Sequence, residues 1–162
     1  MEPKLIEIAD RKLIGMRVRT SHSESTTREL WQRFKPRATE IEGRTSTDFY
    51  SVQIFEDDTT FENLTPATMF EKWAAVEVDR PGNLPEGMET LTILGGTYAV
   101  FVHRGLPSAF GKTASYIYGE WMPGSDYELD ARPHFEIMSE AYRADDPNAE
   151  EEVWLPVRKK NA

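Results

Sequence analysis

The sequence predicts an α+β fold: a pseudo-twofold tandem repeat of two strand-helix-strand-strand units, whose antiparallel sheets surround a central ligand cleft. The prediction depends first on a repeat, because Gly15 and Gly96 lie 81 residues apart (15 to 96), as do Trp73 and Trp154 (73 to 154). It depends second on periodicity, because each half carries one helical apolar pattern among segments rich in strand-forming residues. The seam between two such halves is a common place for a ligand pocket.

Composition favours a single domain over residues 1–162. The chain has 162 residues, of which 39% are hydrophobic and 11% aromatic, and this is enough for a substantial core. A net charge of −9 disfavours direct binding to nucleic acid, which depends on basic surface. The absence of cysteine excludes disulfides and thiolate sites. No apolar run is long enough to span a bilayer and no signal peptide is apparent, so we expect a cytoplasmic protein without a membrane partner.

The first half covers about residues 4–80 and begins with two strands between residues 4 and 20. Thr26 and Glu29 have the spacing of a reciprocal capping box, which predicts a helix start. An apolar stripe at helical spacing follows, and Pro36 should end that helix. The stripe consists of Leu30, Trp31 and Phe34.

Two further strands complete the first half, at residues 48–55 and at about residues 70–78. Within the second of these strands, Glu71 and Lys72 are expected to be solvated charges. Residues 81–87 then contain two proline-glycine breakers and divide the halves.

The second half covers about residues 88–159 and repeats the order. Residues 89–103 predict two strands, or one strand with a bulge at Gly95-Gly96. A helix follows and should stop at Pro123-Gly124. Strands at residues 134–138 and 153–158 close the chain. The expected apolar face of the helix consists of Phe110, Ala114, Ile117, Tyr118 and Trp121.

Several segments in this order resemble the GyrI-like small-molecule-binding family, which also occurs as the effector-binding domain of AraC-type and MerR-type regulators. The resemblance covers nearly the whole chain and implies two strand-helix-strand-strand units around a cleft. Since no helix-turn-helix segment precedes the domain, the stand-alone form is expected. The segments are IGMRVRT at 14–20, LWQRF at 30–34, FYSVQIFEDD at 49–58, GGTYAVFVHRG at 95–105, YIYGEWMPGSDYEL at 116–129, HFEIM at 134–138 and EVWLPVRK at 152–159.

Strand alternation and the repeat together suggest a pocket. If aliphatic strand faces pack beneath the helices, Glu136 and Trp154 point into the cleft. The repeat then places Tyr50 opposite Glu136 and Trp73 opposite Trp154, giving a ring of one acid and three aromatic residues. The resemblance implies a pocket glutamate in the HFEIM strand, which Glu136 matches. Further candidate ligand contacts on the bordering helices are Trp31 and Phe110.

This pocket would suit hydrophobic or cationic ligands. Aromatic faces attract cations, and a desolvated carboxylate supplies the opposite charge while its pKa is raised by burial. The alternative for Glu136 is an exposed strand position. For Tyr50, Trp73 and Trp154 the alternative is an ordinary core position, which also applies to Trp31 and Phe110.

Three functions follow from the sequence and the resemblance. The first is binding of hydrophobic or cationic small molecules, as a sensor or sequestering protein. The second is hydrolysis of strained, cyclopropane-containing toxins, with Glu136 as general base and Tyr50 or Tyr118 as donor. The third is interaction with DNA gyrase or with a regulator protein. No cofactor is indicated, and His22, His103 and His134 lack the spacing of a metal site.

Overall fold

The computed structural model describes residues 2–56, 59 and 63–161, so residues 57 and 58 of the FYSVQIFEDD segment lie outside the described residues. The strands within these ranges are β1 (Lys4–Ile8), β2 (Arg11–Thr20), β3 (Phe49–Ile54), β4 (Phe70–Val78), β5 (Glu89–Ile93), β6 (Gly96–Arg104), β7 (Tyr127–Leu129), β8 (His134–Met138) and β9 (Glu150–Lys159). The helical segments are α1 (Thr27–Phe34), the 3₁₀ turns η1 (Lys35–Glu40) and η2 (Pro107–Ala109), α2 (Phe110–Tyr116), the π-helical turn η3 (Ile117–Trp121) and α3 (Met122–Gly124).

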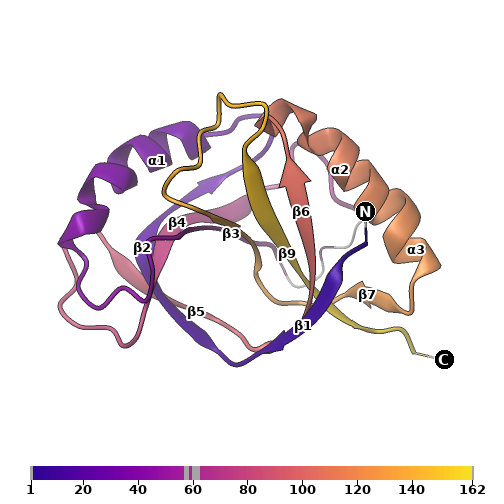
Figure 1. The fold of residues 1–162 in the computed structure, drawn as a ribbon, viewed down its shortest axis with the longest axis horizontal. Helices are drawn as coiled ribbons and strands as arrows, with labels where there is room; N and C mark the ends of the chain where they lie inside the picture. Colours follow the sequence, from indigo (N-terminus) through magenta and orange to yellow (C-terminus); the bar gives the residue numbers. More distant parts are fainter. Residues whose placement is uncertain (1, 57–58, 60–62, 162) are drawn as a thin grey trace.

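One large antiparallel sheet joins these strands in the order β5-β2-β4-β3-β8-β9-β6-β1, and β7 pairs with β9. Consecutive strands β1 and β2 stand near opposite ends of this order, yet only residues 9 and 10 join them. Strands β5 and β6 are related in the same way through residues 94 and 95. The sheet must therefore curl until its ends meet, as Figure 1 shows where β1, β2 and β5 converge at the bottom. The backbone N–H of Gly95 donates to Oδ1 of Asp10 at 2.7 Å and ties the two connections together.

The curled sheet encloses an apolar interior, which we call the interior cluster. Its rings pack at close range: the Phe135 and Trp154 rings are stacked with centroids 5.2 Å apart, and Tyr98 meets Phe135 edge-on at 5.4 Å. Such arrangements add to the stabilisation that burial itself provides. The buried members of the interior cluster are Leu13, Tyr50, Val52, Trp73, Ala75, Ile93, Tyr98, Val100, Phe135 and Trp154.

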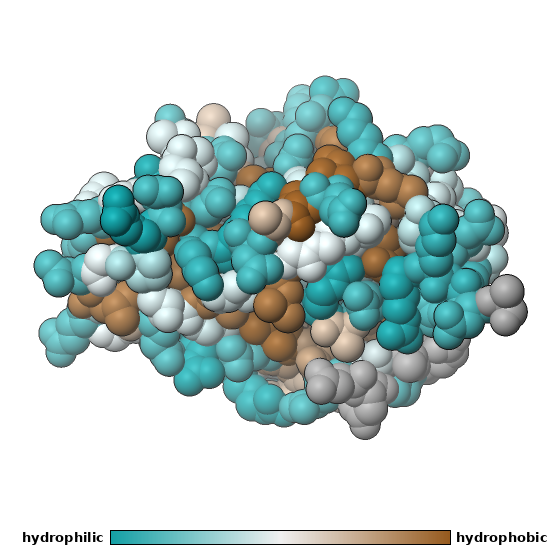
Figure 2. Space-filling view, turned by 90° about the horizontal axis from the view of Figure 1, so that it is seen from below, coloured by the Kyte–Doolittle hydropathy of each residue, from teal (hydrophilic) through white to brown (hydrophobic). Residues whose placement is uncertain are grey.

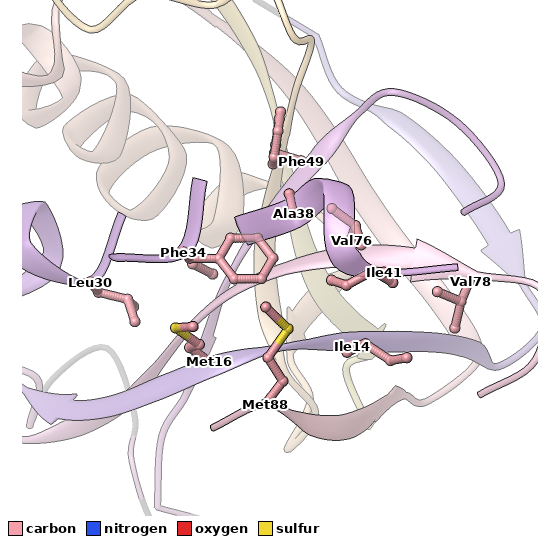
Figure 3. Packing of buried hydrophobic residues seen from close by; sticks show 11 residues of the cluster. Ile14, Met16, Leu30, Phe34, Ala38, Ile41, Phe49, Val76, Val78 and Met88 are labelled. Carbon is pink, nitrogen blue, oxygen red and sulfur yellow. The ribbon is translucent and has the colours of Figure 1, made fainter. Parts of the chain in front are cut away.

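The helices cover the outer, convex face of the sheet at its two sides. On one side, Leu30 and Phe34 of α1 pack onto Ile14 and Met16 of β2 and Val76 of β4 (Figure 3). On the other side, α2 and the turns after it cover a cluster built on β6 and β9, whose buried members are Ala99, Phe101, Ile117, Val153, Leu155 and Val157. In Figure 1, α1 and α2 lie apart on opposite sides of the central strands.

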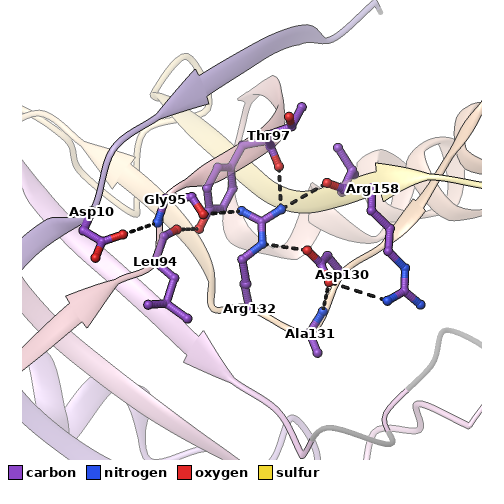
Figure 4. A network of polar contacts seen from close by, with 10 residues as sticks. Asp10, Leu94, Gly95, Thr97, Asp130, Ala131, Arg132 and Arg158 are labelled. Atoms are coloured by element: carbon purple, nitrogen blue, oxygen red, sulfur yellow. Dashed lines mark hydrogen bonds and ion pairs between the residues drawn. The ribbon is translucent and has the colours of Figure 1, made fainter.

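A buried arginine fastens one end of the sheet (Figure 4). The guanidinium of Arg132 donates to the backbone carbonyls of Gly95, Thr97 and Val157 at 3.4, 2.8 and 3.0 Å. It also forms an ion pair with Asp130 at 2.9 Å. One side chain thereby joins the β5–β6 connection, β6, β9 and the loop before β8.

The cap of the first helix differs from the sequence prediction, whereas the second helix ends at Gly124 as predicted. Thr26 is the N-cap residue of α1, but its side chain makes no capping hydrogen bond, so the predicted capping box with Glu29 is wrong. The backbone N–H of Thr26 instead donates to Oγ1 of Thr20 at 2.9 Å, which holds the helix start from β2. The second helix includes an unpredicted π-helical turn and continues as α3 to Gly124. The short strand β7 was not predicted either.

The side of the molecule on which the two strand connections lie is mostly hydrophilic, with apolar side chains in scattered patches (Figure 2). In the part of the chain that the structure describes, no helix has both the length and the apolar character needed to cross a membrane.

Candidate ligand-binding site

A cleft of about 1230 Å³ opens on the convex face, and both α1 and α2 contribute to its walls. Strands β3, β4, β8 and β9 supply its floor, and the loop between β8 and β9 supplies part of its rim. Figure 1 shows this orange-to-yellow loop passing between the two helices. The large apolar and aromatic lining residues are Trp31, Phe49, Phe70, Phe110, Met138 and Tyr142. This size and lining suit a drug-sized organic molecule.

Glu136 lies on the floor of this cleft, on β8, directly opposite Ser51 of β3. Burial raises the pKa of Glu136 to about 7, and the positive charge of Lys72 counteracts this effect only in part. The charge of Glu151 acts in the same direction as burial, whereas a hydrogen bond from Gln53 favours the ionised form. The structure therefore places Glu136 in a cleft, as the sequence suggested, but on the face of the sheet that the helices cover.

Lys72 of β4 lines the same cleft, and the prediction that it is a solvated charge is wrong. Only 7% of the surface of Lys72 is exposed. Burial lowers the pKa of Lys72, while the charges of Glu136 and Glu151 raise it. Among the described residues, Lys72 has no hydrogen-bond or ion-pair partner. The floor of the cleft therefore brings Lys72 together with two acids, Glu136 and Glu151.

Glu151 of β9 and Tyr142 of the β8–β9 loop complete the acidic side of the cleft. Burial raises the pKa of Glu151, and Lys72 opposes this shift. Burial and the charges of Glu151 and Glu136 raise the pKa of Tyr142 to about 12. The Tyr142 hydroxyl therefore keeps its proton at neutral pH and can donate a hydrogen bond.

Trp154, Tyr50 and Trp73 lie on the other face of the sheet, so their predicted position beside Glu136 is wrong. The reason is the strand register. Trp154 pairs with Phe135, and Glu136 pairs with Val153, so Trp154 shares the face of Phe135. The aliphatic face of β9 does pack beneath α2, as expected, but Phe135 points into the interior cluster.

The polar atoms of these three aromatic residues already have protein partners. The Tyr50 hydroxyl accepts a hydrogen bond from Arg11 at 2.9 Å and donates one to Glu77 at 3.2 Å. Trp73 and Trp154 each donate the indole N–H to a glutamate two residues earlier, Glu71 at 2.5 Å and Glu152 at 3.1 Å. These contacts are typical of buried aromatic residues with a structural role.

The two helical candidates do line the cleft, Trp31 from α1 and Phe110 at the start of α2. Tyr118, the other candidate, packs against the cluster beneath α2. Burial raises the pKa of Tyr118, and the charge of Glu136 raises it further, so the two side chains lie within electrostatic reach.

The sequence interpretation missed several floor residues, among them Lys72 and Glu151, and it also missed Gln53, which donates a hydrogen bond to Glu136. The sequence did contain a signal for Lys72. Along an apolar strand, Lys72 shares one face with Phe70, Ala74 and Val76, which are all apolar. Within the described ranges, no group of three or more His, Asp or Glu side chains is arranged to hold a metal ion. The lining residues of the cleft offer charged groups, hydrogen-bonding groups and aromatic faces to a bound molecule.

Comparisons with known proteins agree with this architecture. The sequence matches the GyrI-like small molecule binding domain over residues 1–158. It is 26% identical over 159 residues to the transcriptional regulator BrlR of Pseudomonas aeruginosa, covering 97% of this chain and 56% of the regulator. The chain therefore spans little more than half the length of that relative.

Solved structures share the fold at low sequence identity. SAV2435 bound to tetraphenylphosphonium has a TM-score of 0.72 and 18% identity, covering 98% of this chain and 94% of that one. The EcmrR C-terminal domain has a TM-score of 0.73 and 16% identity, covering 98% of both chains. A hydrolase encoded by lin2189 from Listeria innocua has a TM-score of 0.62 and 12% identity, covering 97% and 92%. Because the family match extends over residues 1–158, this chain belongs to the GyrI-like small molecule binding domain family.

Proposed function

We propose that this domain binds hydrophobic or cationic aromatic molecules in the cleft between α1 and α2, with Glu136 as the opposite charge. The observation that carries the proposal is the position of Glu136 on the floor of an aromatic-lined cleft of about 1230 Å³. A carboxylate with few competing donors attracts a cation strongly in such a setting. Trp31 and Phe110 would stack against the ligand from the two helices.

A comparison of charged and neutral ligands tests this proposal. Tetraphenylphosphonium and neutral triphenylphosphine oxide are titrated into the wild type and Glu136→Gln by calorimetry. We expect Glu136→Gln to weaken phosphonium binding by about tenfold or more and to change oxide binding by less than about threefold. Glu128→Gln, on the exposed surface of β7, should leave both affinities unchanged. Equal losses for both ligands in Glu136→Gln would remove the charge-pairing role.

We infer a sensing or sequestering role in the cytoplasm. BrlR is a transcriptional regulator, and EcmrR has been solved in complex with DNA, which supports sensing. The net charge of −9 favours an arrangement in which this domain does not itself contact nucleic acid. Partnership with a regulator or with gyrase remains a prediction.

The strand order supports the proposed two-fold repeat. The order β2-β4-β3 in the first half has its counterpart in β6-β9-β8 in the second, and β3 meets β8 at the centre. The matching bonds of Trp73 to Glu71 and of Trp154 to Glu152 also suggest two equivalent halves. In this proposal the ligand lies above the β3–β8 seam.

Hydrolysis is a second candidate, because a pKa of about 7 suits Glu136 to general-base catalysis at neutral pH. Glu136 would take a proton from water while the water oxygen attacks a strained ring carbon. The ring bond then breaks, and its electron pair takes up a proton returned by Glu136 or by solvent, so that one water molecule is added overall. Mass spectrometry of a cyclopropane-containing electrophile incubated with the wild type and Glu136→Gln tests this. A hydrated product that forms equally with both proteins would exclude the mechanism.

A further inference from the structure

Lys72 lies on the floor of the cleft, and its side-chain amine has no hydrogen-bond or ion-pair partner among the described residues. Its residue is 7% exposed, and in the described part of the chain it forms neither a hydrogen bond nor an ion pair within 4 Å. Removing a charged group from water costs several kcal/mol unless other polar groups replace the lost hydration. The three N–H donors of this side chain are therefore available to an acceptor on a bound molecule.

The acids of the cleft lie near Lys72 but on other strands. In register, Lys72 of β4 stands beside Gln53 of β3, and Nε2 of Gln53 donates to Oε1 of Glu136 on β8 at 3.4 Å. Glu151 approaches from β9 and also acts electrostatically on Lys72. The positive group and the negative groups thus occupy separate places on one floor, with a neutral amide between Lys72 and Glu136.

His22, which follows β2, is a further titratable group near Lys72. Burial and the charge of Lys72 lower the pKa of His22, so Lys72 opposes protonation of this ring. Lys72 is therefore the basic group that β4 contributes to the floor, and its charge works against a second positive charge on His22.

Resting on the proposed function, we propose that the cleft selects zwitterionic aromatic compounds, with the cationic group of the ligand facing Glu136 and Glu151 and its anionic group accepting hydrogen bonds from Lys72. A ligand with only a cation would leave Lys72 desolvated and would be repelled by it. A ligand with only an anion would meet the two acids without compensation. A zwitterion satisfies both sides and buries no net charge.

The other basic lining residues, Arg28, Lys35 and Arg143, are exposed and do not supply this selectivity. The ammonium of Lys35 lies over the Phe49 ring at 5.4 Å, and its residue is exposed. Arg143 pairs with Asp145 at 3.1 Å, and both side chains are more than 70% exposed. Solvent and salt screen such charges, so each contributes little to discrimination between ligands.

A pair of dyes that differ by one charge tests the proposal. Rhodamine B carries a cationic xanthene and a free carboxylate, and in its ethyl ester the same carboxylate is neutralised. Fluorescence polarisation gives the affinities of both dyes for the wild type, Lys72→Met, Lys72→Arg and Lys35→Met near neutral pH. The wild type should bind rhodamine B about tenfold more tightly than the ester.

The variants should separate the role of Lys72 from that of the rim. Lys72→Met should weaken rhodamine B by about tenfold and strengthen the ester, whereas Lys72→Arg should retain the wild-type preference. Lys35→Met, a matched loss of charge at the rim, should change either affinity by less than about threefold. Thermal unfolding of each variant establishes that it is folded. If Lys72→Met does not fold, the ratio of the affinities for rhodamine B and its ester, measured in the wild type and in Lys72→Arg, decides whether the cleft selects zwitterions.

The outcomes distinguish this inference from the proposed function. Equal wild-type affinities for the two dyes, or a ratio unchanged in Lys72→Met, would overturn zwitterion selection while leaving the binding function intact. If the wild type binds tetraphenylphosphonium but neither dye, zwitterion selection is again overturned and the binding function again stands. Failure of the dyes and of tetraphenylphosphonium alike would overturn both.

Discussion

Gln53 donates a hydrogen bond to Glu136 across the central strand pair, with 3.4 Å between Nε2 and Oε1. This distance is long for a hydrogen bond, so the ionised carboxylate gains little from it. Burial therefore dominates over this bond and over Lys72, and the pKa of Glu136 is about 7. Glu136 consequently changes its charge near neutral pH, and both stability and ligand binding should respond.

The first prediction concerns stability. The folded carboxyl of Glu136 keeps its proton up to a pH of about 7, whereas the unfolded carboxyl releases it near 4.5. Between these values the folded state binds more protons, so the contribution of Glu136 to the free energy of unfolding falls as pH rises. The fall amounts to at most about 3 kcal/mol. The free energy of unfolding is measured with urea at several pH values. Over this window it should fall more steeply with rising pH in the wild type than in Glu136→Gln. Parallel curves would contradict the raised pKa.

The second prediction concerns cation binding. Rising pH ionises Glu136, so the affinity for tetraphenylphosphonium should increase by up to about tenfold per pH unit below the pKa and level off above it. Tetraphenylphosphonium keeps its own charge throughout, which assigns the change to the protein. Calorimetry across this range measures the effect. Glu136→Gln should show a much flatter profile, and an equally steep profile in that variant would assign the titration to another group.

Apart from the short strand β7, the strand positions could be predicted from sequence, but the face of β8 that meets the helices could not. Strand β4 was predicted at its observed bounds, because apolar and β-branched residues fill both of its faces between clear breakers. Strand β8 carries Phe135 and Ile137 on one face and Glu136 and Met138 on the other, so alternation alone does not show which face meets the helices.

The pairing of β8 with strands far away in the sequence determines which of its faces meets the helices. The short β1–β2 and β5–β6 connections curl the sheet, and this curl turns Phe135 inward and Glu136 toward the cleft. Lys72 was misjudged for a related reason. A lysine is usually exposed, and only the pairing of β4 between β2 and β3 places it on a buried face.

The third prediction separates the tryptophans. Trp31 lines the cleft, whereas Trp73 and Trp154 belong to the interior cluster. Ligand-induced quenching of tryptophan fluorescence should therefore disappear in Trp31→Phe and persist in Trp154→Phe. Titration of both variants with tetraphenylphosphonium, alongside calorimetry to establish that binding persists, checks this. Quenching lost in Trp154→Phe and kept in Trp31→Phe would place the ligand on the opposite face of the sheet.

The fourth prediction concerns Arg132, whose side chain is 10% exposed and contacts three backbone carbonyls and Asp130. Its guanidinium also lies 4.6 Å from the centre of the Tyr98 ring. Arg132→Met should lower the free energy of unfolding by about 3 kcal/mol, because it leaves three backbone carbonyls without this donor and removes one partner of the partly buried Asp130 carboxylate. Urea unfolding measures the change.

Arg104 provides the matched control for Arg132. It pairs with Glu150 at 3.0 Å, but its side chain is 68% exposed. Arg104→Met should therefore change the free energy of unfolding by no more than about 0.5 kcal/mol. Similar losses in the two variants would mean that the Arg132 contacts do not fasten the sheet.

The fifth prediction concerns Gly15, one of the glycines that marked the repeat. A Cβ atom there would meet the backbone carbonyl of Ala74 and would lie 2.6 Å from Cβ of Ala75, both on the neighbouring strand β4. Neither atom can move without disturbing the sheet, so Gly15→Ala should destabilise the domain by about 2 kcal/mol or more. Gly111 in α2 has open space around it, and Gly111→Ala should be neutral or stabilising by up to about 1 kcal/mol. Thermal and urea unfolding of the two variants measure this contrast. A Gly15→Ala variant as stable as Gly111→Ala would show that β2 and β4 can separate at this point, and that close strand approach is not what requires the glycine.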